Sequence, residues 1–108
     1  MAANFIELDS VEALDALFAD SHGKPVILFK HSNSCGISAD LRYQMAEVNA
    51  DVHVVVVQTS RSVSNALEAK TGVRHASPQA FVIKDGKHIY HASHYGINPT
   101  EIETKSRS

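Results

Sequence analysis

Hydrophobic and polar positions along the chain predict three central elements. The apolar run 26–29 lies between Pro25 and the polar Lys30 and indicates a short strand buried on both faces of a sheet. Five polar or small residues follow, and apolar residues then recur at helical spacing, which predicts a helix over about 35–48 (Ile37, Leu41, Met45 and Val48). Four consecutive valines within 52–57 predict a central strand in a parallel arrangement.

The remaining pattern adds elements on both sides of these three. A first helix is expected from Ser10, with Asp9 or Ser10 as its cap, and a third helix over 60–71, with Gly72 as its stop. The Asp85-Gly86 pair predicts a tight two-residue hairpin turn. Asn98-Pro99 begins a short last helix, with a frayed tail over about 104–108. The order predicts one domain over 1–108, with a mixed four-stranded sheet and helices on both faces.

Composition narrows the functional classes. The 108 residues carry a net charge of −2 and scattered basic residues, which is weak evidence against a nucleic-acid partner. No apolar run approaches the roughly 20 residues that cross a bilayer, so no membrane association is expected. The single cysteine excludes an internal disulfide, and the N-terminus lacks the features of a signal peptide. These observations favour a cytoplasmic location.

The cysteine, Cys35, lies where the buried strand passes into the second helix. Unpaired N–H groups and the helix dipole favour negative charge there, and only a thiolate is a nucleophile. The alternative is a small buried hydrophobic residue, but the flanking Ser34 and Gly36 argue for reactivity. The Cys-x-x-Ser spacing puts Ser38 where a redox dithiol has its second cysteine, so another molecule must resolve a disulfide at Cys35. Ser38 could donate a hydrogen bond to the thiolate, or serve only as a helix cap.

Other candidate residues surround this junction. Lys30 and His31 could bring positive charge to the sulfur, or could be solvated loop residues. Pro78 is expected to be cis and to face the sulfur, with Ser77 pairing with an extended substrate and with His75 and Gln79 beside it. The alternative is that Pro78 only begins an edge strand.

Three histidines at a spacing of three raise the question of a metal site. In a regular strand, this spacing would put His88 and His91 on opposite faces, and no carboxylate or cysteine lies close by to join them and His94. We therefore expect surface histidines, no metal site and no bound cofactor.

The strand–Cys-x-x-Ser–helix junction, followed by Ser-Pro at the hairpin, is typical of the thioredoxin-like fold. Six blocks of sequence together resemble the YtxJ-like family, the monothiol bacilliredoxins of the bacillithiol system (29–38, 57–58, 61–65, 72–73, 75–79 and 92–95). The resemblance implies that Cys35 removes a low-molecular-weight thiol, bacillithiol or a similar one, from client proteins. The family pattern usually has proline where this chain has Gly36.

Three functional hypotheses follow. The leading one is a monothiol thiol–disulfide oxidoreductase that takes a small thiol from mixed disulfides on client proteins and uses free small thiol as co-substrate. The first alternative is a non-catalytic binding or stress-response module that uses the groove at Ser77 and Pro78. The second is a redox sensor in which Cys35 is oxidised or capped.

Overall fold

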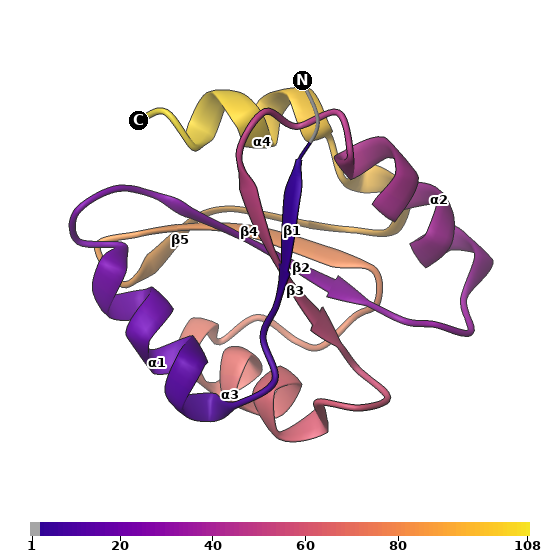
Figure 1. The fold of residues 1–108 in the computed structure, drawn as a ribbon, viewed down its shortest axis with the longest axis horizontal. Helices are drawn as coiled ribbons and strands as arrows, with labels where there is room; N and C mark the ends of the chain where they lie inside the picture. Colours follow the sequence, from indigo (N-terminus) through magenta and orange to yellow (C-terminus); the bar gives the residue numbers. More distant parts are fainter. Residues whose placement is uncertain (1–2) are drawn as a thin grey trace.

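The computed structural model describes residues 3–108 as a twisted sheet between two layers of helices (Figure 1). Its elements follow in chain order: β1 Asn4–Glu7, α1 Val11–Asp20, β2 Val26–His31, α2 Gly36–Met45, β3 Asp51–Val56, α3 Arg61–Thr71, β4 Gln79–Lys84, β5 Lys87–Ser93, the 3₁₀ turn η1 His94–Gly96, and α4 Pro99–Lys105.

The sheet has the strand order β1-β3-β2-β4-β5. Strands β1, β3 and β2 are parallel, while β4 is antiparallel to both β2 and β5. The predicted mixed sheet with helices on both faces is confirmed, but the number of strands was wrong. The additional strand is β1, which pairs with β3 from Asn4 opposite Asp51 to Glu7 opposite Val54. Four residues are too few to show the period of a strand in the sequence.

Two hydrophobic layers hold the helices to the sheet. Helices α1 and α3 cover one face and α2 and α4 cover the other (Figure 1). Strand β2 lies in the middle, and each of its six residues is buried. Successive residues therefore enter different cores: Leu28 lies in the α1/α3 layer and Phe29 in the α2/α4 layer.

The ends of the elements follow local chemistry that the sequence indicated. The Ser10 hydroxyl accepts a hydrogen bond from the Ala13 N–H at 3.1 Å and caps α1. Gly72 ends α3 in the left-handed conformation, with φ of 72°. Asp85 and Gly86 both have positive φ, 54° and 76°, as a tight hairpin turn between β4 and β5 requires. Helix α2 is shorter than predicted and ends at Met45.

A β-bulge in the hairpin changes the direction of two histidines. Val82 pairs with Tyr90 but Ile83 pairs with His88, so Ile89 is the extra residue on β5. The expectation that His88 and His91 point to opposite sides was therefore wrong: their ring centroids lie 5.0 Å apart in an edge-on contact. Nowhere in residues 3–108 do three His, Cys, Asp or Glu side chains meet as a metal site would require.

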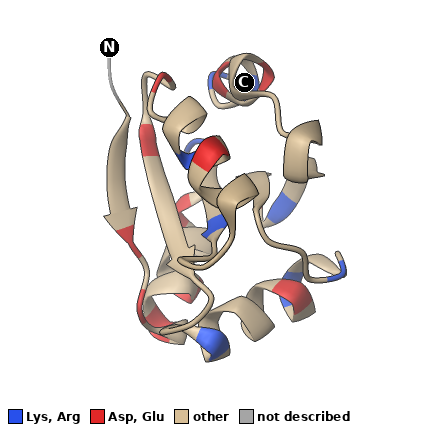
Figure 2. Ribbon diagram, turned by 90° about the vertical axis from the view of Figure 1, so that its right-hand side faces the viewer, with Lys and Arg blue, Asp and Glu red and all other residues tan. Residues whose placement is uncertain are grey.

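Acidic and basic residues are interspersed over the helices and strands that Figure 2 draws. None of the helices within residues 3–108 combines the length and the apolar character needed to span a bilayer.

The end of α1 is tied to the hairpin turn by Ser21, which is fully buried. Its hydroxyl donates to the Phe18 carbonyl at 2.5 Å and accepts from the Gly86 N–H at 2.9 Å. The Ser21 carbonyl accepts from the Asp85 N–H at 2.9 Å. The two contacts with Asp85 and Gly86 join residues more than 60 positions apart and hold the turn between β4 and β5 against the end of α1.

We expect Ser21→Ala to lower the free energy of unfolding by about 1–2 kcal/mol, because it leaves the Gly86 N–H without a partner. Urea denaturation monitored by circular dichroism measures this change. Ser62→Ala, at an exposed position of α3, is the matched control and should shift stability by less than about 0.5 kcal/mol. Equal effects of the two substitutions would contradict a structural role for Ser21.

Candidate functional site

Cys35 is the N-cap residue of α2, in an extended conformation with φ of −115° and ψ of 120°. It is a free, partly exposed cysteine. Within the described residues its sulfur makes no hydrogen bond, and its carbonyl accepts from the Ala39 N–H at 3.1 Å. The sequence prediction of a cysteine at a strand-to-helix junction is therefore correct, and the thiol lies beside the unpaired amides of the first helical turn.

The loop before Cys35 is held by Gln58, which follows β3. The Gln58 Nε2 donates to the hydroxyls of Ser32 at 2.7 Å and Ser34 at 3.1 Å. The Gln58 Oε1 accepts from the Asn33 N–H at 3.1 Å. Ser34 therefore contributes to the site by anchoring the loop next to the thiol. Sequence analysis included Gln58 in a block of the family resemblance but gave it no role, because one polar residue after a strand has no periodic signal.

Ser38 is fully buried, and its hydroxyl is engaged away from the sulfur. It lies 2.8 Å from the Nδ1 of His31 and accepts from the Ser32 N–H at 2.9 Å. The hydrogen bond from Ser38 to the thiolate that the sequence suggested is absent from this structure. Burial, and next the charge of Arg42, lower the pKa of His31, while a hydrogen bond with Ser38 opposes them. His31 and Ser38 thus fix the start of α2 to the end of β2.

Lys30 points to the opposite face of β2 and is fully buried. Its Nζ lies 3.3 Å from the Nδ1 of His75, which also lies 3.3 Å from the Ser64 hydroxyl. Burial lowers the pKa of Lys30 from its ordinary value of 10.5 to about 8, and the charge of Glu68 opposes this shift. Burial, and next the charge of Lys30, lower the pKa of His75. The structure therefore joins two predicted site residues that are 45 positions apart.

The Ser77–Pro78 peptide bond is cis, as predicted. The Pro78 carbonyl accepts from the His94 N–H at 3.0 Å, which connects the proline to the end of β5. Gln79 donates its Nε2 to the Arg74 carbonyl at 2.9 Å. The Ser77 hydroxyl and the Gln79 Oε1 are buried without a partner among the described residues. Pairing of Ser77 with a substrate stays a prediction.

Tyr95 is a further residue of this region that sequence reasoning did not select. It lies in η1 next to α2 and is 63% exposed. Loss of hydration raises the pKa of Tyr95, and Asp40 and the charge of Cys35 raise it further. The phenol therefore lies within electrostatic reach of the thiol.

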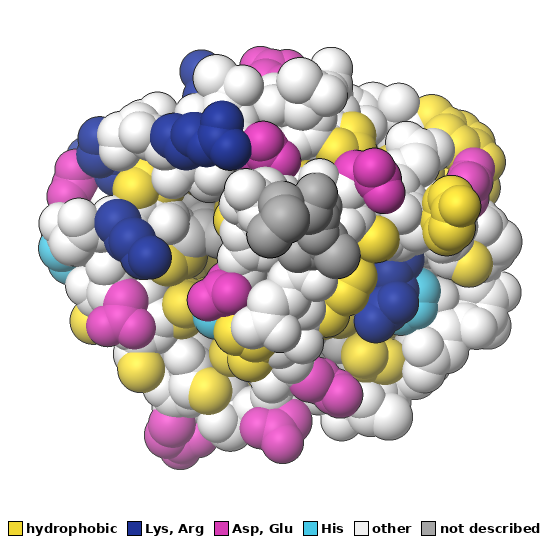
Figure 3. Space-filling view, turned by 45° about the horizontal axis from the view of Figure 1, so that its top comes forward, with side chains coloured by type: hydrophobic (Ala, Val, Ile, Leu, Met, Phe, Trp, Pro, Cys, Tyr) yellow, Lys and Arg dark blue, Asp and Glu magenta, His cyan; other side chains and the backbone are white. Residues whose placement is uncertain are grey.

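The end of the sheet that carries Cys35 also has two hollows. One, of about 380 Å³, lies between α2 and the strands β1 and β3. Arg42 stacks over the Phe5 ring there, 4.3 Å from its centroid, and His31 contributes to the wall. Figure 3 shows a basic side chain and a histidine side by side among hydrophobic side chains on this part of the surface. The other hollow is smaller, about 80 Å³, and is lined by His75 and residues of α3.

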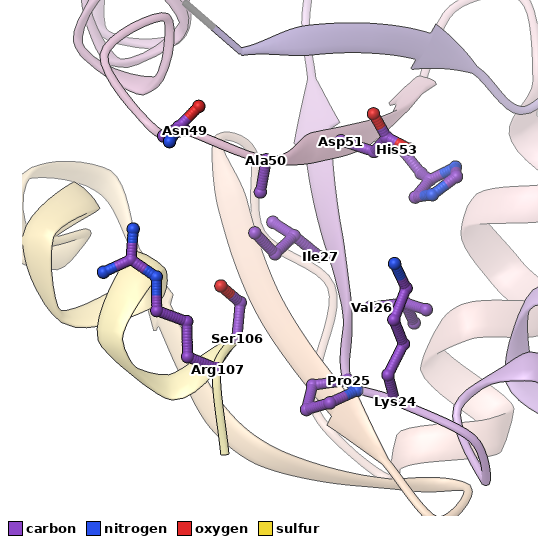
Figure 4. A pocket seen from close by; sticks show the side chains of 10 residues that line it. All are labelled: Lys24, Pro25, Val26, Ile27, Asn49, Ala50, Asp51, His53, Ser106 and Arg107. Carbon is purple, nitrogen blue, oxygen red and sulfur yellow. The ribbon is translucent and has the colours of Figure 1, made fainter. Parts of the chain in front are cut away.

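A third hollow, of about 360 Å³, lies at the opposite end of the sheet, where β2 and β3 begin. Lys24 and Arg107 stand on its two sides (Figure 4). None of the predicted site residues lines it. It is therefore separate from the thiol site.

Comparison with known proteins agrees with this geometry. Residues 6–102 match the family described as monothiol bacilliredoxin BrxC. A solved structure described as a candidate oxidoreductase with a thioredoxin fold is 30% identical, with a TM-score of 0.84 over 94% of this chain and 92% of that chain. Thioredoxin from Fasciola hepatica is 20% identical, with a TM-score of 0.68 over 94% and 99% of the two chains. Thioredoxin from Nicotiana alata is 18% identical, with a TM-score of 0.74 over 100% and 96%. The last two show the fold alone.

Lys30 should make stability depend on alkaline pH. Its folded pKa of about 8 lies below its ordinary value of 10.5, so between these values the unfolded chain binds more protons. The free energy of unfolding of the wild type should therefore gain from Lys30 as the pH rises from 8 to 10.5. Lys30→Met should be more stable than wild type at pH 7 and should lack this gain. Urea denaturation at several pH values measures both, and identical pH profiles would contradict the burial of a charged Lys30.

Proposed function

Because the chain belongs to the monothiol bacilliredoxin family and is a thiol–disulfide oxidoreductase, we propose that Cys35 is its nucleophile. The substrate is a client protein whose cysteine carries a low-molecular-weight thiol as a mixed disulfide. Bacillithiol, or a thiol similar to it, is the small thiol that Cys35 takes over. The observation that carries this proposal is a single accessible thiol at the start of α2 with a buried serine at the resolving position.

The reaction has two balanced exchanges. In the first, the Cys35 thiolate attacks the sulfur of the small thiol, the client's disulfide breaks, and the client leaves as a thiolate. A disulfide between Cys35 and the small thiol remains. In the second, a free small thiolate attacks that disulfide, which regenerates the Cys35 thiolate and releases the small thiol as its symmetrical disulfide. No protein cofactor is needed.

The surroundings of Cys35 support this chemistry. Backbone N–H groups at the start of α2 favour negative charge on the sulfur. Ser38 carries a hydroxyl in place of a second thiol, so it cannot attack a disulfide at Cys35, and this hydroxyl is hydrogen-bonded with His31 and Ser32. An adduct at Cys35 therefore persists until an external thiol arrives. We place the reaction in the cytoplasm, where a reducing pool supplies that thiol.

The Ser77–Pro78 segment is the proposed contact for the client. We infer that the backbone of Ser77, next to the cis Pro78, pairs with an extended client segment. His75 and Gln79 flank this segment and complete the proposed substrate-binding residues.

The test is transfer of the small thiol, measured by intact mass spectrometry. A protein–bacillithiol mixed disulfide is mixed with the protein, and the wild type should gain the mass of one bacillithiol while the client loses it. Cys35→Ala should gain nothing, because no other sulfur nucleophile of this kind exists in the chain. Ser38→Ala should still form the adduct, since a serine cannot resolve it.

Turnover separates the proposal from its alternatives. With excess free bacillithiol, the wild type should reduce many equivalents of client. One stoichiometric modification without turnover would favour a redox sensor. Unchanged substrate with both wild type and Cys35→Ala would overturn the proposed reaction and leave a binding module.

A further inference from the structure

Three basic side chains converge beside the thiol site without an ion pair. Lys30 is buried against His75, and Arg61 lowers the pKa of His75 through its charge. Within residues 3–108, every ion pair involves other cations, and Lys30, Arg61 and His75 belong to none of them. Glu68 is the carboxylate that acts on Lys30 and His75 from α3, and it makes no ion pair with either one. A buried cation without a bound anion is costly and calls for a function.

The hydrogen bonds fix the direction in which His75 donates. An ammonium group has only donors, so the Nδ1 of His75 must accept from Lys30 while Lys30 is charged. A neutral His75 then carries its proton on Nε2. His75 is exposed and lines the neighbouring hollow, so we assign this N–H to a ligand bound there.

The hollow itself is small and mostly polar. Its volume is about 80 Å³, enough for one small anionic group, and its wall combines the guanidinium-bearing Arg61 with Ser64, Asn65 and His75. Arg61 and Asn65 are exposed, so the opening faces solvent. An arginine fork, an imidazole N–H and an amide suit a carboxylate.

Neighbouring residues connect this hollow to the loop that carries Cys35. Val57 forms part of its wall and directly precedes Gln58, whose side chain holds Ser34 next to Cys35. On the other side, His75 lies three residues before the cis-proline Pro78. The ends of β2 and β3 and the start of β4 lie at one end of the sheet (Figure 1), so these loops meet there.

We propose that Lys30, Arg61 and His75 form a carboxylate subsite that recognises the small thiol transferred to Cys35. This inference rests on the proposed function and adds the feature that selects the thiol. Arg61 and the His75 Nε2 bind the carboxylate directly, while the buried Lys30 acts as a positioning residue that fixes His75. The subsite favours attack on adducts whose thiol carries a carboxylate.

The hollow under Arg42 is the nearest rival. It also combines a basic residue with a histidine, but Glu7 lies in its wall and Arg42 already stacks on Phe5. A carboxylate ligand would meet Glu7 in the wall itself there, whereas Glu68 does not line the hollow at His75. Arg42 therefore serves as the matched control, because Arg42→Gln removes the same charge from a position near the same loop.

The first experiment compares small thiols of different charge. One peptide without acidic residues is prepared in three forms, with 3-mercaptopropionate, 2-mercaptoethanol or cysteamine joined to its cysteine by a disulfide. The rate of adduct transfer to Cys35 is measured by mass spectrometry for each thiol. The rate of each variant is divided by the wild-type rate with the same thiol, which removes the intrinsic reactivity of that thiol. Arg61→Gln should slow transfer of the anionic thiol about tenfold relative to the neutral one. Lys30→Met should act in the same direction, and Arg42→Gln should leave the ratio near its wild-type value.

A second measurement does not depend on rates. Wild-type protein is loaded at Cys35 with 3-mercaptopropionate or with 2-mercaptoethanol, and the His75 ring is titrated by NMR. A carboxylate between Arg61 and His75 favours the imidazolium, so the pKa of His75 should be higher in the anionic adduct. Lys30, Arg61 and Glu68 face His75 in both adducts, so their contributions cancel in the comparison.

The outcomes are distinct. If no thiol forms an adduct, the proposed function fails. A second outcome overturns only the subsite. In it, adducts form and the pKa of His75 is the same in both adducts, while Arg61→Gln either changes all rates equally or has the same effect as Arg42→Gln. A peptide with an aspartate next to its cysteine, carrying 2-mercaptoethanol, tests the other source of a carboxylate. If Arg61→Gln slows transfer from that peptide and from no other, the subsite binds the client's carboxylate, and its assignment to the small thiol is overturned.

Discussion

The burial of β2 on both faces is the constraint on which the site depends. Helices cover both sides of the sheet, so neighbouring residues of β2 must enter different layers. Lys30 therefore meets His75, whose ring also contacts Ser64 of α3, whereas His31 meets Ser38 on the α2 side. These two adjacent basic residues look like one charged patch in the sequence, but in the fold they make two separate sets of contacts.

The two sets of contacts have different effects on the structure. His31 and Ser38 join the last residue of β2 to the first turn of α2 and so fix the backbone on which Cys35 stands. Lys30 contacts His75 but has no ion pair among the described residues, and its burial costs stability while it is charged. Residues that cost stability are characteristic of functional sites. In the proposed subsite, α3 contributes Arg61, although this helix carries no reactive group.

Much of the fold could be predicted from the sequence, because β2, β3 and the helices have strong periodic signals and Asp85-Gly86 has unambiguous turn chemistry. Strand β1 could not, since it is short and depends on contacts with distant residues, among them its pairing with β3. The bulge at Ile89 could not either, because it depends on how β5 meets β4. That one extra residue brings His88 against His91, which a regular strand would separate.

The positions of Cys35 and of the cis-proline could be predicted from the sequence, but the hydrogen bonds that support them could not. Cys35 and Pro78 are marked by their residue types at two junctions, and the proline is cis. The role of Gln58 arises from hydrogen bonds to a loop 24 to 26 positions earlier, and no local pattern records such contacts. The same is true of Lys30 and His75, whose contact depends on β2 pairing with the strand that follows Pro78.

Gly36 shows what this supporting network achieves. It is the first residue of α2, a Cβ there would meet nothing within 4 Å, and its φ lies outside the left-handed region. Neither space nor backbone conformation therefore requires glycine, and a proline suits this helical position well. Without the proline ring, the first turn has more conformational freedom to lose on folding. The hydrogen bonds of Ser38 and Gln58 to the loop 31–34 must then order the thiol's surroundings, because the residue next to Cys35 does not.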